Sequence, residues 1–182
     1  MIRALPTPDS YEVIFDGLTA VPPHGRLLAG EYPSAPTQAK AEAKLARFLD
    51  TGVTFFLDLT EAGEYQLREY ATAVQTMAAA RNQHVTHHRQ AVPDMSAPST
   101  AQMTEILDTL DTALENGETV YVHCFGGIGR TGTVIGCWLV RHGLTGEEAL
   151  ANIAAWRANT PDGHRTSPET NLQRQMVRRW TS

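Results

Sequence analysis

The sequence is poor in cysteine, lacks a long apolar run and carries no excess of positive charge. Two cysteines in 182 residues are too few for a disulfide framework. No apolar run approaches the ~20 residues that cross a bilayer, so we expect no membrane insertion. A formal net charge of −5 gives no general attraction to nucleic acid, and any anion site must be local. The first residues lack a signal-peptide stretch, so we expect a reducing, cytoplasmic setting.

Length and composition are those of one globular domain. The chain is 42% hydrophobic and 19% charged, which is ordinary for a soluble fold and too apolar for intrinsic disorder. We therefore predict a single domain over residues 1–182. Residues 1–25 are rich in proline and glycine and predict surface loop, followed by an edge strand at Arg26–Ala29.

The remaining sequence alternates helical and strand patterns. The predicted helices are residues 37–50, 64–81, 100–115 and 130–143, a helix that follows a Thr145–Glu148 capping box, and residues 168–180. The predicted strands are residues 53–59, 84–90 and 118–124. This order predicts an α/β domain with a central, mostly parallel sheet flanked by helices on both faces. Ligands of such sheets bind beyond the carboxyl ends of the strands, where Cys124 lies.

Residues 123–131, HCFGGIGRT, connect a predicted strand to a predicted helix. Such a loop turns its backbone N–H groups and the positive end of the helix dipole toward one anion. The glycines let the backbone approach phosphate oxygens closely. The same field favours the thiolate of Cys124, which is the nucleophilic form, and Arg130 can grip two phosphate oxygens with its planar fork. We expect the phosphate to be bound by Phe125, Gly126, Gly127, Ile128, Gly129 and Arg130.

A lone cysteine at a strand end is ordinarily a buried structural residue. Here the cysteine, the glycines, the arginine and Thr131 occur together at one strand-to-helix junction, which favours a catalytic role. The string resembles the His-Cys-x5-Arg-Thr/Ser signature of cysteine-based protein tyrosine phosphatases, and the chain looks most like their small atypical dual-specificity branch. The resemblance extends from about Leu28 to the C-terminus. It implies hydrolysis of phosphate esters through a phosphocysteine intermediate, without a cofactor or metal.

The resemblance also implies a general acid upstream of the cysteine, and two Pro-Asp pairs compete for this role. Asp94 follows a predicted strand and precedes the helix that leads to the catalytic strand, as the acid loop of the family does. Asp162 lies in a Pro-Asp-Gly sequence that is also typical of a plain turn. We therefore favour Asp94 as the group that protonates the leaving oxygen.

Three further residues receive supporting roles. The stretch SPETNLQ resembles the family motif that orients the hydrolytic water, which assigns this role to Gln173, although a surface position on a helix is the alternative. Thr131 can donate a hydrogen bond to the Cys124 sulfur, cap the helix, or do both. His123 is expected to orient the loop rather than act as a base, because a thiolate needs none. The carboxylate that supports Arg130 stays open among Glu31, Asp58 and Glu61.

Other chemically active residues have simpler interpretations. The histidines at positions 84, 87 and 88 do not predict a metal site, because neighbours on a strand point to opposite faces and no further ligands lie nearby in the sequence. Cys137 lies on an apolar helix face and is expected in the core, while a regulatory disulfide to Cys124 stays open. Arg157, His164 and Arg165 either rim the pocket or lie in a solvated loop.

The expected substrate is a phosphorylated protein or peptide, phosphotyrosine most readily. Phosphoserine and phosphothreonine stay open, and phosphate, sulfate or vanadate should bind as active-site anions. No lysine lies between Cys124 and Arg130, whereas phosphoinositide phosphatases of the family place basic residues there. This disfavours an inositol phosphate or phospholipid, and the acidic balance disfavours a nucleotide or nucleic acid. The alternative of another class is a non-catalytic phosphoprotein-binding module, but such modules usually lose the cysteine, the arginine or the acid.

Overall fold

The structure is a computed structural model, and it describes residues 4–19 and 25–181. These residues contain one five-stranded sheet in the spatial order β1-β2-β5-β3-β4. The strands are β1 (Tyr11–Glu12), β2 (Arg26–Gly30), β3 (Phe55–Asp58), β4 (Thr86–Arg89) and β5 (Thr119–His123). Strands β2, β5, β3 and β4 pair in parallel, and β1 runs antiparallel to β2. The prediction of a mostly parallel sheet is confirmed.

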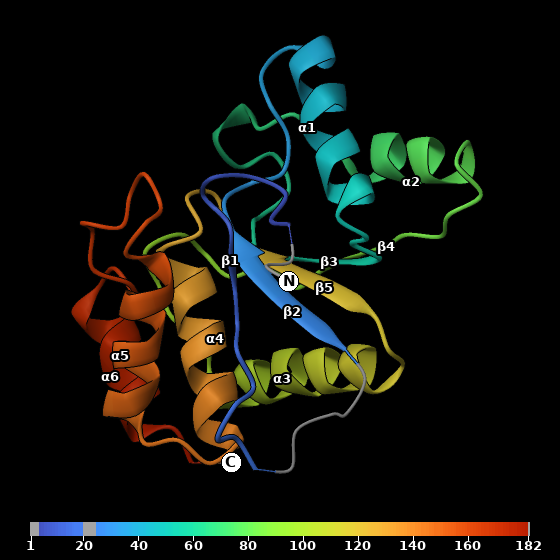
Figure 1. Cartoon of the computed structure of the whole chain (residues 1–182). Helices are drawn as coiled ribbons and strands as arrows, with labels where there is room; N and C mark the ends of the chain where they lie inside the picture. Colours follow the sequence, from blue (N-terminus) through green and yellow to red (C-terminus); the bar gives the residue numbers. More distant parts are fainter. Residues whose placement is uncertain (1–3, 20–24, 182) are drawn as a thin grey trace.

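Helices cover both faces of this sheet, as predicted. They are α1 (Gln38–Asp50), α2 (Ala71–Ala79), α3 (Thr100–Glu115), α4 (Gly129–Arg141), α5 (Gly146–Arg157) and α6 (Asn171–Arg179), with a short 3-10 turn η1 (Glu64–Gln66). Figure 1 shows α1 and α2 on one side of the sheet and α3 to α6 on the other. The capping box of Thr145 and Glu148 forms as expected and starts α5. No helix in the described part of the chain combines the length and apolarity needed to span a bilayer.

The three central strands, β2, β5 and β3, each contribute to two separate cores. Leu28 and Phe56 pack with α1 and α2, whereas Leu27 and Leu57 pack with α3 and α4. This division follows from the period of two along a strand, which sends neighbouring side chains to opposite faces. Burying one such side chain contributes about 1.5–3 kcal/mol. The strand ends at the carboxyl edge of the sheet are therefore held by packing on both sides.

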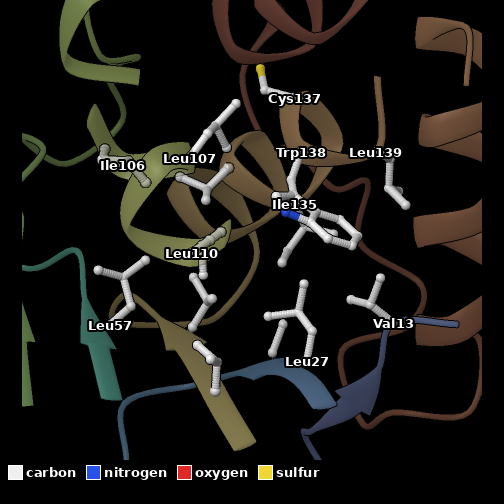
Figure 2. Packing of buried hydrophobic residues seen from close by; sticks show 14 of the residues in the cluster. Val13, Leu27, Leu57, Ile106, Leu107, Leu110, Ile135, Cys137, Trp138 and Leu139 are labelled. Carbon is white, nitrogen blue, oxygen red and sulfur yellow. The ribbon is translucent and has the colours of Figure 1, made fainter. Parts of the chain in front are cut away.

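Helix α4 is buried along almost its whole length. Figure 2 shows Trp138 of this helix among the apolar side chains of the larger core. Its indole nitrogen donates to Asp111 at 2.8 Å, which satisfies the polar end of a fully buried ring. Because its flanks are packed, α4 holds the loop at its N-terminus in a fixed position.

Strand β2, which the sequence predicted at the edge of the sheet, is the second strand of the sheet, one position in from the edge. Strand β2 pairs with β5 on one side and with β1 on the other, and Tyr11 of β1 is only 2% exposed. The prediction of surface loop for the N-terminal segment overlooked this short strand. Two residues give no period that a sequence pattern can detect. Pairing with β2 and the packing of Tyr11 in the larger core stabilise them. Residues 1–3 and 20–24 lie outside the described residues.

The helix predicted over residues 64–81 is wrong in its first half. Tyr65 and Gln66 have positive φ angles of 47° and 54°, and α2 begins only at Ala71. Helix propensity differs by less than ~1 kcal/mol between most residues, so tertiary contacts override it. The predicted last helix also starts late, at Asn171, because Thr170 forms a capping box with Gln173.

Candidate active site

Residues 124–128 connect the end of β5 to the start of α4 and form a tight loop, here named the phosphate loop together with Gly129 and Arg130. Gly127 has a φ of 68°, and a Cβ there would lie 2.2 Å from the carbonyl carbon of Gly30. Only glycine fits this position. The carbonyl of Phe125 accepts from the backbone N–H of Tyr32 at 2.9 Å. These contacts tie the loop to the carboxyl end of β2.

The start of α4 has the features of an anion site. Its N-cap, Ile128, makes no side-chain capping bond, so the first-turn amides remain available at the positive end of the helix dipole. Cys124 is 3% exposed at the base of the loop. Among the described residues, the Nε of Arg130 is buried without a hydrogen-bond partner. The start of α4 is therefore the candidate anion site, and the arrangement of these donors around the cysteine sulfur stays a prediction.

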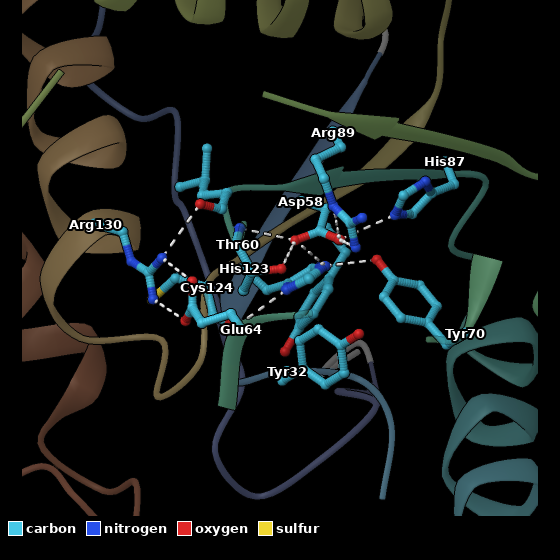
Figure 3. Close-up of polar contacts among 12 residues, drawn as sticks. Tyr32, Asp58, Thr60, Glu64, Tyr70, His87, Arg89, His123, Cys124 and Arg130 are labelled. Atoms are coloured by element: carbon cyan, nitrogen blue, oxygen red, sulfur yellow. Dashed lines mark hydrogen bonds and ion pairs between the residues drawn. The ribbon is translucent and has the colours of Figure 1, made fainter. Parts of the chain in front are cut away.

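Arg130 is anchored by a carboxylate that the sequence did not single out. Its terminal nitrogens donate to the two oxygens of Glu64 at 2.7 and 2.6 Å, and one of them also donates to the carbonyl of Val92 at 2.9 Å (Figure 3). Burial alone would lower the pKa of Arg130, but the hydrogen bonds with Glu64 and the charges of Cys124 and Asp94 raise it above its ordinary value. The guanidinium therefore stays charged and fixed.

Asp94, the predicted general acid, lies at this arginine. Its Oδ1 is 3.1 Å from the Nη2 of Arg130, and its Oδ2 accepts from the hydroxyl of Tyr65 at 2.6 Å. The β4–α3 loop (residues 90–99) that carries Asp94 is also held through Val92, whose carbonyl accepts from Arg130. The fold thus brings Cys124 and Arg130 of the phosphate loop together with an aspartate from a second segment, the β4–α3 loop.

Gln173 also lies against the phosphate loop. It is 1% exposed, and a Cβ on Gly129 would be 3.0 Å from its Oε1. Its Nε2 donates to the carbonyl of Ser96 in the β4–α3 loop at 2.9 Å. The surface alternative for Gln173 is therefore wrong. In this conformation, its side chain joins α6, the phosphate loop and the β4–α3 loop. Its role in orienting the hydrolytic water stays a prediction.

The hydroxyl of Thr131 is fully buried and has no hydrogen-bond partner among the described residues. The predicted bond from this hydroxyl to the Cys124 sulfur is thus not formed in this conformation. A buried hydroxyl costs stability unless it finds a partner. The role of Thr131 in the departure of the sulfur stays a prediction.

Residues 32–144, which include α1 to α4 and the whole phosphate loop, match the family described as polymorphic toxin system, DSP-PTPase phosphatase. The chain belongs to this family. Membership confirms the expected small dual-specificity branch of the cysteine-dependent tyrosine phosphatases.

Curated relatives of this phosphatase share a shorter stretch. Cyclin-dependent kinase inhibitor 3 of Sus scrofa is 39% identical over 56 residues, 31% of this chain and 26% of that protein. Dual specificity protein phosphatase CDC14B of Mus musculus is 39% identical over 78 residues, 42% of this chain and 16% of that protein. The matched stretches therefore span about a quarter or less of these relatives' own lengths.

Solved structures resemble this phosphatase over most of its length. The kinase associated phosphatase KAP, with serine at its catalytic cysteine, superposes with a TM-score of 0.66 at 18% identity, over 84% of this chain and 83% of that one. The active form of Tk-PTP gives a TM-score of 0.62 at 27% identity, over 92% and 93% of the two chains. The likeness to KAP supports the fold alone, which is the one predicted.

His123 of this phosphatase is hydrogen-bonded to the backbone of Cys124. Its Nδ1 donates to the carbonyl of Cys124 at 3.1 Å, and its Nε2 accepts from the hydroxyl of Tyr70. Burial lowers the pKa of His123 to about 4, although the charge of Asp58 opposes this effect. The imidazole is therefore neutral at physiological pH, which fits the predicted orienting role.

Asp58 is the centre of a buried polar cluster behind the phosphate loop (Figure 3). Its Oδ1 accepts from the N–H and hydroxyl of Thr60, and its Oδ2 accepts from His87 at 3.0 Å and Arg89 at 2.9 Å. Burial alone would raise the pKa of Asp58, but the hydrogen bond from His87 and the other contacts hold it well below its usual range. The carboxylate stays ionised and ties β3 to β4 beneath the site.

The three carboxylates that the sequence offered as supports for Arg130 do not take this role. Asp58 pairs with Arg89, Glu31 pairs with Lys44, and the side chain of Glu61 is exposed. Glu64 takes the role instead. Because Glu64 lies in an alanine-rich stretch with a helical pattern, no local signal distinguished it from a solvated glutamate.

Other predicted candidates lie away from the phosphate loop. Asp162 faces Arg165 at 3.7 Å in the turn after α5, and Arg157 is buried against the carbonyls of that turn. A separate cavity of about 430 Å³ is lined by Arg157, His164 and Arg165 and by none of residues 124–130. Cys137 is fully buried in the core, and burial raises the pKa of its thiol to about 12.

Proposed function

We propose that this phosphatase hydrolyses phosphotyrosine in proteins through a phosphocysteine intermediate. One observation carries the proposal: Arg130 extends from the loop of Cys124 to within 3.1 Å of the Asp94 carboxylate. A nucleophile, a phosphate-binding fork and an acid that lie together are the minimal set for this chemistry. The likeness of the phosphate loop to the family signature supports the same assignment.

In the first step, the Cys124 thiolate attacks the phosphorus atom and forms the S–P bond. The bond from phosphorus to the leaving oxygen breaks, and Asp94 transfers its proton to that oxygen. Arg130 and the first-turn amides of α4 hold the equatorial phosphate oxygens, where negative charge is distributed in the transition state. The products of this step are a free hydroxyl compound and phosphocysteine.

In the second step, water attacks the phosphocysteine. Asp94, now a carboxylate, accepts the proton of the water, while the S–P bond breaks and the Cys124 thiolate and inorganic phosphate form. We assign Gln173 to the orientation of this water, because its side chain packs on Gly129 of the phosphate loop. Thr131 supports the departure of the thiolate when its hydroxyl turns toward the sulfur.

Aromatic side chains at the rim favour phosphotyrosine. Tyr65 and Phe125 are 62% and 49% exposed, with ring centroids 5.3 Å apart. They also line an adjoining cavity of about 780 Å³ that extends to Arg68, which gives room for residues that flank a phosphotyrosine in a polypeptide. An aromatic leaving group can pack on these rings, whereas a short phosphoserine side chain reaches them poorly.

We propose that the whole chain acts as one domain. Helix α6, outside the family match, contributes Gln173 and contacts the β4–α3 loop. Both cysteines are free, and a reducing cytoplasm is therefore the setting in which we expect the enzyme to work.

Hydrolysis of phenyl phosphate, followed by release of inorganic phosphate with a chelator present, tests the proposal, because its poor leaving group requires the general acid. We expect activity in the wild type, loss of activity in Cys124→Ser, and a 10²- to 10⁴-fold decrease, on the order of a lost general acid, in Asp94→Ala. Asp162→Ala is the matched control and should retain activity. Acid-quenched enzyme should carry a phosphoryl group on Cys124 by mass spectrometry. Inhibition by the chelator, or loss of activity in Asp162→Ala alone, would contradict the mechanism.

Phosphopeptides of one sequence that carry phosphotyrosine, phosphoserine or phosphothreonine test the substrate. We expect the highest kcat/KM for the phosphotyrosine peptide. Equal values for the three peptides would indicate dual specificity, and no hydrolysis of any of them, beside activity on the aryl phosphate, would indicate a non-protein substrate.

A further inference from the structure

Tyr65 makes a contact that its position on the surface does not require. The side chain is 62% exposed, yet its hydroxyl donates to the Oδ2 of Asp94 at 2.6 Å. The other oxygen of the same carboxylate, Oδ1, lies 3.1 Å from the Nη2 of Arg130. The two oxygens of Asp94 are therefore distinguished: one is held by a phenol and the other lies at the group that binds phosphate.

The backbone that places this hydroxyl is strained. Tyr65 and Gln66 both have positive φ angles, 47° and 54°, in a region that costs about 1–3 kcal/mol for residues other than glycine. Such a conformation persists where surrounding contacts determine it. Here Glu64 supplies them, because its carboxylate binds Arg130 on one side and accepts from the backbone N–H of Glu61 at 3.0 Å on the other.

The aromatic ring of Tyr65 is held as well as its backbone. It packs on Phe125 of the phosphate loop with 5.3 Å between centroids and an interplanar angle of 48°. Phe125 is itself tied to β2 through its carbonyl. The turn at η1 thus carries two neighbouring residues with separate tasks: Glu64 fixes the arginine, and Tyr65 reaches the aspartate.

We propose that Tyr65 is a positioning residue for the general acid, holding one oxygen of Asp94 so that the other faces the leaving oxygen of the substrate. This inference rests on the proposed function. In the proposed acid form, Oδ1 carries the proton that is transferred once the substrate phosphate has replaced this oxygen at Arg130, while the hydroxyl of Tyr65 donates to Oδ2 throughout. The hydrogen bond to Asp94 also raises the pKa of Tyr65, so the phenol keeps its proton and remains a donor at neutral pH.

A positioning residue of the acid has an effect that depends on the leaving group. A poor leaving group, such as unsubstituted phenolate with a pKa of about 10 like tyrosine, requires proton transfer as it departs. Nitrophenolate departs without it far more readily. A misplaced acid therefore slows phenyl phosphate and leaves 4-nitrophenyl phosphate nearly unaffected, whereas a general loss of structure slows both.

The test compares kcat for these two substrates in the wild type, Tyr65→Phe, Asp94→Asn and Tyr32→Phe. Tyr65→Phe removes only the hydroxyl and keeps the ring on Phe125. Tyr32→Phe is the matched control, because its hydroxyl donates at 3.2 Å to the carbonyl of Arg68, in the same chain segment but not to the acid. Thermal unfolding of each variant shows whether it is folded.

We expect Tyr65→Phe to lower kcat for phenyl phosphate about tenfold and kcat for 4-nitrophenyl phosphate less than about twofold. Asp94→Asn should show the same split with a larger decrease, and Tyr32→Phe should show none. Wild-type rates for Tyr65→Phe on phenyl phosphate, or equal losses on both substrates, would overturn the role of Tyr65 while leaving the phosphatase proposal intact. A wild type as inactive as Cys124→Ser would overturn both.

Discussion

The two terminal nitrogens of Arg130 bind the two carboxylate oxygens of Glu64 at 2.7 and 2.6 Å, and both side chains are almost fully buried. A bidentate pair of this kind fixes the plane of the guanidinium. Desolvation offsets much of the attraction between two buried charges, so the pair is better understood as a positioning device than as a source of stability. Its consequence is that the guanidinium is held in one orientation, with its Nε left without a hydrogen-bond partner among the described residues.

Glu64→Gln should weaken phosphate binding. The neutral amide accepts with one oxygen only, so the arginine loses half of its fork and rotates more freely. We expect kcat/KM for an aryl phosphate to decrease about 10- to 100-fold, with weaker inhibition by vanadate. Glu61→Gln is the control, because its side chain is exposed in the same turn. Equal kinetics of the two variants would remove Glu64 from the site.

Gly127→Ala should disrupt the phosphate loop, whereas Gly126→Ala should not. A Cβ at Gly127 meets the backbone of Gly30 at 2.2 Å and sits at a φ of 68°, while a Cβ at Gly126 finds its nearest neighbour, the Cδ1 of Ile128, at 3.8 Å. We expect the first change to lower the free energy of unfolding by about 2–4 kcal/mol and the second by less than about 1 kcal/mol. Urea unfolding measures both, and activity should follow the same order.

Stability should decrease as the pH falls from 6.5 toward 4, because of His123. In the unfolded chain this histidine takes up a proton below its ordinary pKa of 6.5, whereas in the folded protein its pKa is lowered to about 4. The unfolded state therefore binds more protons in this window. As a result, the free energy of unfolding is lower by up to about 3 kcal/mol at the lower end of the window, near pH 4.

Denaturant unfolding at a series of pH values checks this slope. His123→Asn should unfold more easily at every pH but show a shallower decrease between pH 6.5 and 4. Asp58 loses its stabilising contribution only below this window, because its pKa is lowered from an ordinary value of 3.8. An unchanged slope in the variant would mean that His123 is not the titrating group.

The two cysteines should differ in reactivity. Burial raises the pKa of Cys137 to about 12, so its thiol stays protonated at neutral pH and unreactive. Cys124 lies at the proposed anion site, and iodoacetate, itself an anion, should modify it selectively in the native protein. Mass spectrometry should find both cysteines modified in denaturant, and vanadate should protect Cys124. Modification of Cys137 first would contradict the proposed environment of the catalytic sulfur.

Local patterns were sufficient for most of the architecture. The apolar strand before Cys124, the glycines after it and the capping box at Thr145 are short-range signals, and each was found where it was predicted. The same holds for the alternation of helices and strands, because hydrophobic periodicity is a property of neighbouring residues. The broken helix at residues 64–70 shows the limit, since the contact with Arg130 that opposes helical propensity is 66 residues away in the chain.

The mostly parallel α/β sheet and the loop of Cys124 and Arg130 could be predicted from the sequence, because both depend on residues that are adjacent in the chain. In contrast, it takes the folded chain to reveal that Glu64 anchors the arginine, that Tyr65 reaches Asp94 and that Gln173 is buried rather than exposed. These contacts join segments 29 to 77 residues apart. Their physical basis is the meeting of parallel strands at one carboxyl edge, which no local propensity encodes.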